Sequence, residues 1–590
     1  MPESSYSPDK TPKRQGRYKP KGRQVDPARL RAVEDVLQPH LQERVLQRDR
    51  LIEYLHILQD KTGYLSAADL AALAELMRLP MAEIWEVASF YDHFDLISEG
   101  ETPPPPRTIR VCTSLSCMLQ GSHDLLAELQ AMNSEDVRFV AAPCLGACDK
   151  APAAADGHHL IPIAHAGSLK MTADAPVHRA SLAYYNDFAA YCDAGGYQLV
   201  KALSSGEADK QVLLAELEAS ALRGMGGAGF PTGRKWRIVS SYDGPRNLAV
   251  NGDEGEPGTF KDRHYLSTDP HRMIEGVLIA AHIVGIEKAF IYMRDEYPEI
   301  IEMLHIELAK VAKAGLDAHV DIELRRGAGA YICGEESAMI ESIEGKRGLP
   351  RHRPPYVAET GLFGQPTLVN NIETLFWVRD ILEHGAEWYN RQGKEGHPGF
   401  RTYSVSGRVK QPGLVTAAAG STADELIAAC GGMADGHHFK AYLPGGASGG
   451  ILPASKADIP LDFGGSLAEE GCFVGSHAVV ILSDQDNIWD AARNLMQFFA
   501  HESCGQCTPC RSGTDKAAEL MAAARPDTNL LGELAATMAD ASICGLGQAA
   551  PNPLLSAIKH FPQDIMQENL GQIESLPAKA KPPVEGVSNG

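Results

Sequence analysis

The pattern of apolar residues in the first hundred positions is helical. Leu70, Leu73 and Met77 recur at intervals of three and four, which places them on one face of a helix. The same spacing returns after Pro80. We therefore predict a small helical bundle over residues 28–100.

The next segment alternates strand and helix patterns. The apolar runs 108–112 and 137–141 are short enough for strands, and leucines at 125, 126 and 129 between them have helical spacing. This strand–helix–strand order is typical of a small α/β domain. We predict such a domain over residues 101–180, with cysteines on its loops and a stiff proline linker at 103–106.

Three further units follow beyond residue 180. Residues 181–400 are rich in glycine and alternate strands with helices, which predicts a larger α/β domain. Short apolar strands around one helix near 423–429 predict a small β-rich module over 401–485. Apolar positions at 488, 491, 495 and 498 line one helix face and predict a C-terminal helical bundle over 486–575. The predicted fold class is multidomain, α/β and α+β.

Composition and charge narrow the classes of function. The chain has 590 residues with 55 Lys and Arg against 76 Asp and Glu, so its formal net charge is −21. This acidity argues against nucleic acid or an anionic membrane surface as a partner. No apolar run approaches the ~20 residues of a membrane span. We expect a cytoplasmic protein with a disordered basic arm at 1–27 and a disordered tail at 576–590.

The cysteines are clustered. Eight of the 12 form two sets of four, and the solitary ones are typical of small buried hydrophobic residues. The first set is Cys112, Cys117, Cys144 and Cys148. Two close pairs on two loops can hold a [2Fe–2S] cluster, and their spacing favours this over structural zinc, which usually takes C-x2-C knuckles.

The second set is Cys504, Cys507, Cys510 and Cys544. Three cysteines at intervals of three can wrap one loop around three corners of a cubane, and a distant cysteine closes the fourth. Zinc would more naturally use two separated pairs. The spacing therefore predicts a [4Fe–4S] cluster.

A glycine-rich loop at 224–230 is a candidate anion site. It looks like a dinucleotide fingerprint, but the residues before it have helical spacing, which disfavours a standard Rossmann site. A Walker A loop is disfavoured too, because no hydroxyl residue follows Lys235. The glycines still let backbone N–H groups approach an anion, and Lys235 supplies a positive charge.

Two acidic loops add candidate ligand contacts. A short strand at 248–250 leads into residues 251–256, whose three carboxylates form either a solvated turn or acceptors for ribose hydroxyls and amides. Farther on, Glu335 and Glu336 stand where a helix is predicted to begin. A helix N-terminus favours negative charge, and its free N–H groups also suit a ligand phosphate.

Long motifs carry a resemblance to a known family. Four segments resemble the flavin- and NADH-binding subunit of respiratory complex I. They are LRGMGGAGFPTGRKW (222–236), NGDEGEPGTFKD (251–262), GAGAYICGEE (327–336) and ESCGQCTPCR (502–511). Residues 28–180 resemble its thioredoxin-like [2Fe–2S] companion, here fused at the N-terminus. The 401–485 module resembles the soluble-ligand-binding β-grasp (ubiquitin-like) domain, with an architectural role. The resemblance implies FMN, NAD(H), one [2Fe–2S] cluster and one [4Fe–4S] cluster.

The resemblance also implies which residues touch the cofactors. FMN would be surrounded by Gly224, Gly226, Lys235, Asn251, Asp253, Glu254, Tyr331, Gly334, Glu335, Asn370, Asn371 and Thr374. The dinucleotide would be contacted by Phe230, Glu256 and Glu336. Arg353 and Tyr356 stand where the complex I pattern has Lys and Phe, and can substitute as a cation and an aromatic near the nucleotide. No amino acid is expected to be catalytic, because the flavin carries the chemistry.

The fused arrangement is similar to the diaphorase subunits of NAD-dependent formate dehydrogenases and NAD-reducing hydrogenases. Residues 21–27, 404–413 and 444–455 look most like the beta subunit of a tungsten- or molybdenum-containing formate dehydrogenase. The implied partner in a heterodimer is a catalytic alpha subunit with a metal–pterin and further iron–sulfur clusters. Electrons would pass between NAD(H), FMN, the Cys504 set and that partner, with the Cys112 set off the main line. A hydrogenase diaphorase, a complex I arm and a flavin-free assembly scaffold are the alternatives.

Overall fold

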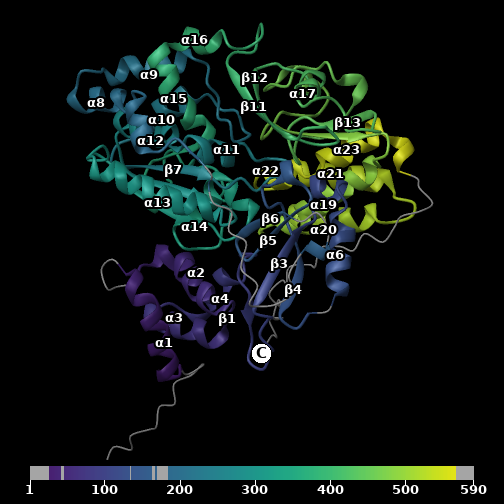
Figure 1. Ribbon diagram of the computed structural model, residues 1–590, viewed down its shortest axis with the longest axis horizontal. Helices are drawn as coiled ribbons and strands as arrows, with labels where there is room; N and C mark the ends of the chain where they lie inside the picture. Colours follow the sequence, from purple (N-terminus) through teal and green to yellow (C-terminus); the bar gives the residue numbers. More distant parts are fainter. Residues whose placement is uncertain are drawn as a thin grey trace, which may run out of the picture.

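The computed structural model describes residues 25–41, 46–132, 134–162, 166–168, 182 and 184–565 (Figure 1). The tail predicted at 576–590 and nearly all of the arm predicted at 1–27 lie outside these residues. The boundary predicted near residue 180 lies outside them as well.

The described part of the N-terminal unit consists of four α-helices and a short parallel strand pair. The helices are α1 (Pro27–Leu37), α2 (Leu51–Thr62), α3 (Ala67–Met77) and α4 (Met81–Ala88), and the strands are β1 (Leu65–Ser66) and β2 (Leu96–Ile97). The side chain of Ser66 accepts from the N–H of Asp69, whose carboxylate accepts from the N–H of Ser66. This reciprocal cap starts the helix that carries the predicted apolar stripe.

The second unit is a four-stranded sheet in the order β4-β3-β5-β6. Strands β3 (Arg107–Cys112) and β4 (Val137–Ala142) are parallel and are joined through α5 (Leu115–Leu119) and α6 (Ser122–Ala131), as the pattern predicts. The antiparallel hairpin of β5 (Ala153–Asp156) and β6 (His159–Pro162) was not predicted. Alanine-rich β5 lacks the β-branched and aromatic residues that mark a strand in sequence.

The central sheet has four parallel strands in the order β10-β7-β8-β9. They are β7 (Arg246–Gly252), β8 (Ile286–Met293), β9 (Asp321–Arg326) and β10 (Thr367–Asn371). Because the strands are parallel, the loops that follow them leave from one edge of the sheet, where open α/β sheets bind ligands. The glycine-rich loop, by contrast, follows a helix, as predicted.

Alternate residues of the central strands face two different cores. Leu248 and Val250 pack with α12 (Pro270–Val284) and α15 (Ile372–His384). Ala249 and Phe290 pack with α14 (Glu336–Ile343) and with the N-terminal helices. The N-terminal unit therefore covers one face of the central sheet.

The other helices of the central unit surround these cores. They are α7 (Phe188–Asp193), α8 (Gln198–Ser205), α9 (Lys210–Ala219), α10 (Thr232–Ser240), α11 (Lys261–Thr268), α13 (Pro298–Lys313) and α16 (Ala386–Asn390). Figure 1 shows most of them in blue to teal around β7.

The β-rich module is a five-stranded mixed sheet in the order β12-β11-β15-β13-β14. Its elements are β11 (Phe400–Gly407), β12 (Gly413–Ala418), α17 (Ala423–Ala429), β13 (Phe439–Leu443), β14 (Leu452–Pro453), α18 (Gly465–Glu469) and β15 (Ala478–Ser483). Leu426 and Ile427 of α17 pack on Tyr403 and Val405 of β11, which places the predicted helix on one face of the sheet.

The C-terminal unit is a helical bundle that lies beside the β-rich module in Figure 1. Its helices are α19 (Ile488–Glu502), α20 (Thr508–Met521), α21 (Thr528–Ala541), α22 (Gly545–Ala549) and α23 (Asn552–His560). The prediction that three cysteines share one loop is wrong in part: Cys504 and Cys507 precede α20, but Cys510 lies in its first turn. A proline in that turn favours a helix start there.

Candidate functional site

Loops at the carboxyl edge of the central sheet enclose a cavity of about 530 Å³. The glycine-rich loop, the acidic loop after β7 and the loop before α14 each supply part of its wall. The predicted ligand residues that line it are Gly226, Asn251, Asp253, Glu254, Glu256, Tyr331, Gly334, Glu335 and Asn371. Three loops that are separate in sequence thus meet at one site.

Asp253 presents an unsatisfied oxygen at this wall. Its Oδ2 atom is buried and has no hydrogen-bond partner among the described residues. Its backbone N–H donates to Asn251 Oδ1 at 3.0 Å, which fixes the turn. Burial raises the pKa of Asp253 well above its usual value. A buried acceptor without a partner costs roughly 1–3 kcal/mol, so this atom suits a donor on a bound ligand.

The carboxylate of Glu254, unlike that of Asp253, is bound by groups of the protein. Its carboxylate accepts from the N–H groups of Asp262 at 2.7 Å and Arg263 at 3.1 Å, and from the Tyr297 hydroxyl at 3.1 Å. Burial raises the pKa of Glu254 to about 7. These contacts cap the start of α11. The side chain therefore lines the cavity while its oxygens bind the protein itself.

Glu256 links the acidic loop to the β-rich module. Its Oε1 atom accepts from the Ser448 N–H at 3.0 Å and from the Ser448 hydroxyl at 2.6 Å. Phe473 and Ser476 of the same module also line the cavity. The module therefore forms part of the wall, which goes beyond the architectural role expected for it.

The glycine-rich loop is held in place by its neighbours. Gly227 has a φ of 123°, a conformation that residues with a Cβ rarely adopt. The N–H of Met225 donates to Thr374 Oγ1 at 2.9 Å, and the N–H of Gly224 donates to a carbonyl at the far end of the loop. Asn370 accepts from a buried indole of α10 at 2.9 Å. Thr374 thus fixes the loop, Gly224 closes it on itself, and Asn370 anchors the helix that follows it.

A cluster of charged side chains and one aromatic ring lies beside the cavity. Arg353 pairs with Glu335 at 2.6 Å and with Glu336 at 2.8 Å. The Lys235 Nζ atom lies 6.0 Å from the ring centre of Phe230, and burial lowers the pKa of Lys235. The predicted residues that lie outside the cavity wall are Gly224, Phe230, Lys235, Glu336, Arg353, Tyr356, Asn370 and Thr374.

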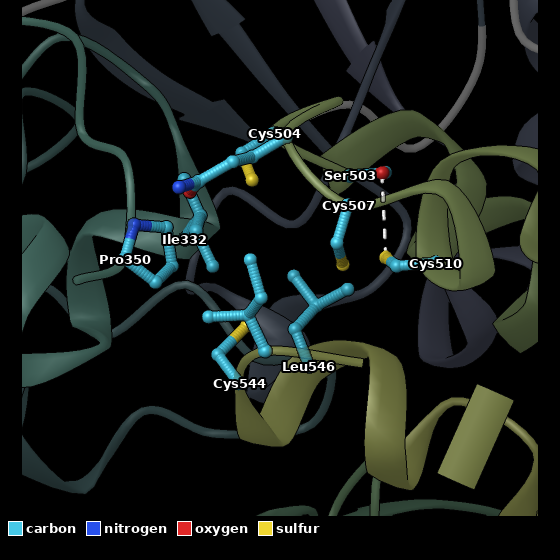
Figure 2. Close-up of a pocket in the computed structure, with 10 residues that line it drawn as sticks. Ile332, Pro350, Ser503, Cys504, Cys507, Cys510, Cys544 and Leu546 are labelled. Atoms are coloured by element: carbon cyan, nitrogen blue, oxygen red, sulfur yellow. Dashed lines mark hydrogen bonds between the residues drawn. The ribbon is translucent and has the colours of Figure 1, made fainter. Parts of the chain in front are cut away.

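The cysteines of the second set converge on a small enclosed space (Figure 2). Cys504, Cys507, Cys510 and Cys544 line it together with Ile332, Pro350 and Leu546. Burial raises the pKa of Cys510 to about 12 and that of Cys544 to about 11. Four sulfur donors around one space fit a cubane cluster.

The cysteines of the first set are packed still more tightly. Each is at most 3 % exposed, and the sulfur atoms of Cys144 and Cys148 are 3.5 Å apart. The Cys112 thiol interacts with those of Cys117 and Cys144. The contact with Cys117, together with burial, raises the pKa of Cys112 well above its usual value, and the contact with Cys144 opposes that shift. Cys117 lies in α5 and not on a loop as predicted. A compact group of four sulfur donors fits a two-iron cluster.

Sequence reasoning missed much of the cavity wall. The missed residues are Met225, Gly227, Ala228, Gly255, Thr259, Lys261, Asp262, Ile332, Ser448, Phe473, Gly475, Ser476, Phe499, Gly545, Leu546, Gln548, Ala549 and Asn552. Lys261 is buried and pairs with Asp262 at 2.9 Å and with Glu373 at 3.0 Å. Its motif, NGDEGEPGTFKD, offered a signal. The residues of the β-rich module and of the C-terminal bundle reach the cavity through tertiary packing, and their sequences offered no such signal.

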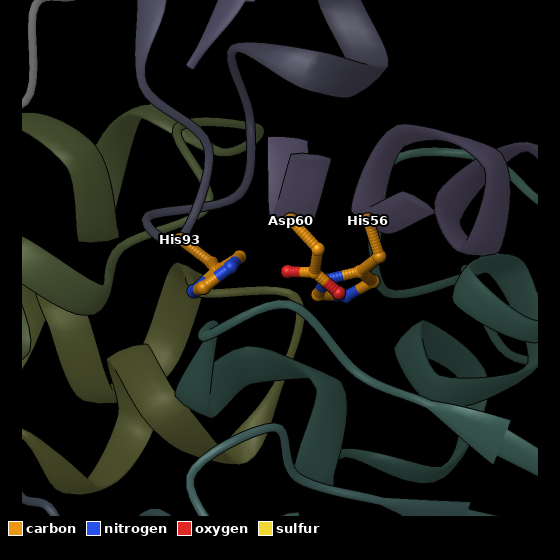
Figure 3. A group of neighbouring side chains, drawn as sticks. All are labelled: His56, Asp60 and His93. Carbon is orange, nitrogen blue, oxygen red and sulfur yellow. The ribbon is translucent and has the colours of Figure 1, made fainter. Parts of the chain in front are cut away.

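A second polar cluster lies where the N-terminal bundle, the β5–β6 hairpin and the central sheet meet. His56 and Asp60 come from α2, and His93 comes from the loop before β2 (Figure 3). The ring of His93 lies 5.0 Å from that of His56 and 4.6 Å from that of His158, between ring centres. Imidazole and carboxylate groups at this spacing are potential metal ligands.

The charges of this cluster are already balanced. Asp295 pairs with His158 at 2.8 Å and with Arg326, and Asp60 pairs with the same two residues at 3.0 and 2.7 Å. Burial lowers the pKa of His158, but the two carboxylates outweigh this effect and raise it to about 9. Because two cations neutralise the two carboxylates, we interpret the cluster as a tie between units and not as a metal site.

Comparison with known proteins agrees with this geometry. Residues 37–169 match the model of the thioredoxin-like [2Fe–2S] ferredoxin, and residues 217–380 match that of the Nuo51 FMN-binding domain. Residues 402–452 match the SLBB domain, and residues 490–568 match the NADH-ubiquinone oxidoreductase-F iron–sulfur binding region. The F subunit of the NADH-quinone oxidoreductase of Mycobacterium tuberculosis (strain ATCC 25618 / H37Rv) is 41 % identical over 386 residues, which cover 62 % of this chain and 86 % of that protein. The chain belongs to the family of NADH-quinone oxidoreductase F subunits.

Other relatives extend the similarity. The F subunit of the Aquifex aeolicus (strain VF5) NADH-quinone oxidoreductase is 39 % identical over 390 residues, which cover 63 % of this chain and 89 % of that protein. A chain of an NAD+-reducing [NiFe]-hydrogenase in the H2-reduced state superposes with a TM-score of 0.77 at 34 % identity. The match covers 89 % of this chain and 94 % of that chain. It thus extends over most of the fused arrangement.

The expected fold class and cofactors are confirmed by these matches. The chain is an NADH-oxidising electron-transfer module of the NADH dehydrogenase type, with an FMN-binding domain, a [2Fe–2S] domain and a [4Fe–4S] region. The unsatisfied Asp253 oxygen and the two sets of four sulfur donors fit these groups. Bound FMN exchanges electron pairs with NADH and single electrons with iron–sulfur clusters. No helix among the described residues is both long and apolar enough to cross a bilayer.

Proposed function

We propose that this chain binds FMN in the 530 Å³ cavity and receives electrons there from NADH. One observation carries the proposal: Ile332 and Leu546 line both this cavity and the space enclosed by Cys504, Cys507, Cys510 and Cys544. The two sites therefore share a wall one side chain thick. Such proximity suits single-electron transfer between a flavin and a cluster.

Within this proposal the residues divide by role. Gly226, Asn251, Asp253, Gly334 and Asn371 line the FMN site, and Glu254 shapes it through α11. Phe230, Glu256, Glu336, Arg353 and Tyr356 receive NAD(H), and Lys235 lies on the FMN side. Cys112, Cys117, Cys144 and Cys148 hold the [2Fe–2S] cluster, and the Cys504 set holds the [4Fe–4S] cluster. The chain's own residues bind the cofactors, orient them and exclude water from the sites.

Glu256 gives a direct test of this division. Its side chain lines the cavity and is held by Ser448, so Glu256→Ala should weaken NADH binding more than FMN binding. Equilibrium binding of each cofactor to the purified variant measures the two effects. Equal loss of both cofactors would contradict the assigned role.

We further propose that the partner is the catalytic alpha subunit of a formate dehydrogenase with a tungsten- or molybdenum-pterin. Residues 21–27, 404–413 and 444–455 support this through their resemblance to the beta subunit of such enzymes. A hydrogenase partner is the second candidate, favoured by the similarity to a chain of the NAD+-reducing [NiFe]-hydrogenase.

Isolation of the native complex separates these candidates. The complex should contain tungsten or molybdenum in its large subunit, and the whole complex should reduce NAD+ with formate. Nickel in the complex, together with hydrogen-dependent NAD+ reduction, would favour the hydrogenase partner instead.

A further inference from the structure

Arg294 follows β8 and lies between the acidic loop and the first cysteine set. Its side chain is 3 % exposed. One guanidinium nitrogen donates to the backbone carbonyl of Glu254, and another donates to the backbone carbonyl of Cys144 at 2.6 Å. One buried side chain thus bonds to a loop of the large cavity and to a loop that carries two of the four cysteines.

The charge of Arg294 acts on both sites. The guanidinium donates to the Cys144 carbonyl, so its positive charge lies beside the backbone of a proposed cluster ligand. Burial raises the pKa of Asp253 well above its usual value, and the Arg294 charge opposes that shift. The carboxylate that pairs with Arg294 is Glu296, at 3.0 Å.

This placement has a consequence for a cluster held by Cys144. Reduction adds one negative charge to an iron–sulfur cluster, and its potential depends on nearby charge and hydrogen bonding. A buried cation stabilises the reduced form, because the surrounding protein screens the interaction less than water does. Hydrogen bonding to the ligand's own backbone adds a fixed orientation.

We propose that Arg294 is a positioning residue shared by the two sites: it holds the Cys144 loop against the acidic loop and raises the reduction potential of the [2Fe–2S] cluster. This inference rests on the ligand assignment proposed above. A purely structural role for Arg294 would change the yield of folded protein without changing the potential.

The test is a redox titration of the holoprotein followed by EPR of both clusters. Arg294→Met should lower the ratio of reduced to oxidised [2Fe–2S] cluster at a fixed potential at least tenfold, which corresponds to ~59 mV for one electron. Arg294→Lys keeps the charge and should retain most of the ratio. The [4Fe–4S] signal of the same sample provides an internal reference that should stay in place.

Two further variants keep the inference open to refutation. Arg138 also ties the first cysteine domain to its neighbour, through Asp95, so Arg138→Met should leave the ratio unchanged. Glu296→Gln removes the carboxylate that offsets Arg294 and should raise the ratio about threefold. An unchanged ratio in a cluster-loaded Arg294→Met protein overturns the inference.

Two other outcomes, loss of the cluster in Arg294→Met and survival of the [2Fe–2S] signal in Cys144→Ala, are also decisive. If Arg294→Met loses the cluster, Glu296→Gln decides: a ratio that stays level or falls overturns the inference. A [2Fe–2S] signal that survives Cys144→Ala would overturn the ligand assignment instead, and with it the basis for Arg294.

Discussion

Asp253, Glu254 and Glu256 are near neighbours in sequence, yet their carboxylates do different things. Glu254 binds two backbone N–H groups of α11, and Glu256 binds Ser448 of the β-rich module. Asp253 Oδ2 has no partner in the described part of the chain. The sequence marks this loop as acidic, but the partners that separate its members come from distant segments.

Asp253→Asn should weaken FMN binding at least tenfold. A buried hydrogen-bonding group left without its partner costs roughly 1–3 kcal/mol, and the Asn amide is a poorer match for a ligand donor than the carboxyl group. Flavin retained after gel filtration, together with equilibrium dialysis, measures the effect. Thermal stability should hold or rise, because the substitution replaces a buried carboxyl group whose Oδ2 atom has no hydrogen-bond partner among the described residues.

Glu254→Gln is the matched control for that substitution. It should lower Tm by several degrees, because α11 loses charge-assisted capping, with a smaller effect on flavin affinity. An Asp253→Asn protein that keeps its full flavin complement would contradict the role assigned to Asp253.

Cys544→Ala should abolish or convert the [4Fe–4S] EPR signal and leave the [2Fe–2S] signal intact. The two sets of cysteines lie in separate spaces, so the loss of one ligand should stay local. Cys430→Ala, in the core of the β-rich module, is the control and should leave both signals unchanged. Persistence of both signals in Cys544→Ala would show the ligand set to be wrong.

At the scale of elements, periodicity predicts best where a segment packs on one face. The helix expected near 423–429 is found at Ala423–Ala429, and the apolar run after residue 487 forms α19. Strands β12 and β14 escaped prediction because they lie at the edges of their sheet and have little apolar alternation. Helix α20 was not predicted, because the cysteine motif at its start was interpreted as a loop.

The β5–β6 hairpin is tied to the rest of the protein by His158. The carboxylates of Asp60 and Asp295 raise the pKa of His158 to about 9, against the lowering effect of burial. Its stabilising effect is therefore complete below the unfolded pKa of ~6.5 and is lost as the pH rises through 9. The largest effect on the free energy of unfolding is ~3 kcal/mol.

His158→Asn should remove this pH dependence. Thermal unfolding between pH 6 and about 10 measures it, with the steepest loss in the native protein centred near the folded pKa. The neighbouring His159 pairs with Glu299 and supplies a control, His159→Asn, that should keep the dependence. Parallel curves of thermal stability against pH for the native protein and His158→Asn would contradict the stabilising role of His158.

At the scale of the whole molecule, the cofactor sites are built by several units at once. The central sheet supplies the acidic loop, the β-rich module supplies Ser448 and Ser476, and the C-terminal bundle supplies Leu546 and Asn552. The family motifs predicted which cofactors are present. They could not predict the shared wall or the contribution of the module, because both arise from contacts between residues hundreds of positions apart.

In the proposed function, electrons enter at the flavin cavity and cross the shared wall to the Cys504 cluster. Anaerobic titration of the purified holoprotein with NADH, followed by flavin absorbance and low-temperature EPR, tests this route. The flavin band should bleach and the [4Fe–4S] signal should grow in the same titration. Bleaching of the flavin while that cluster stays oxidised, at a potential where chemical reductants reduce it, would exclude electron transfer from the flavin to the Cys504 cluster.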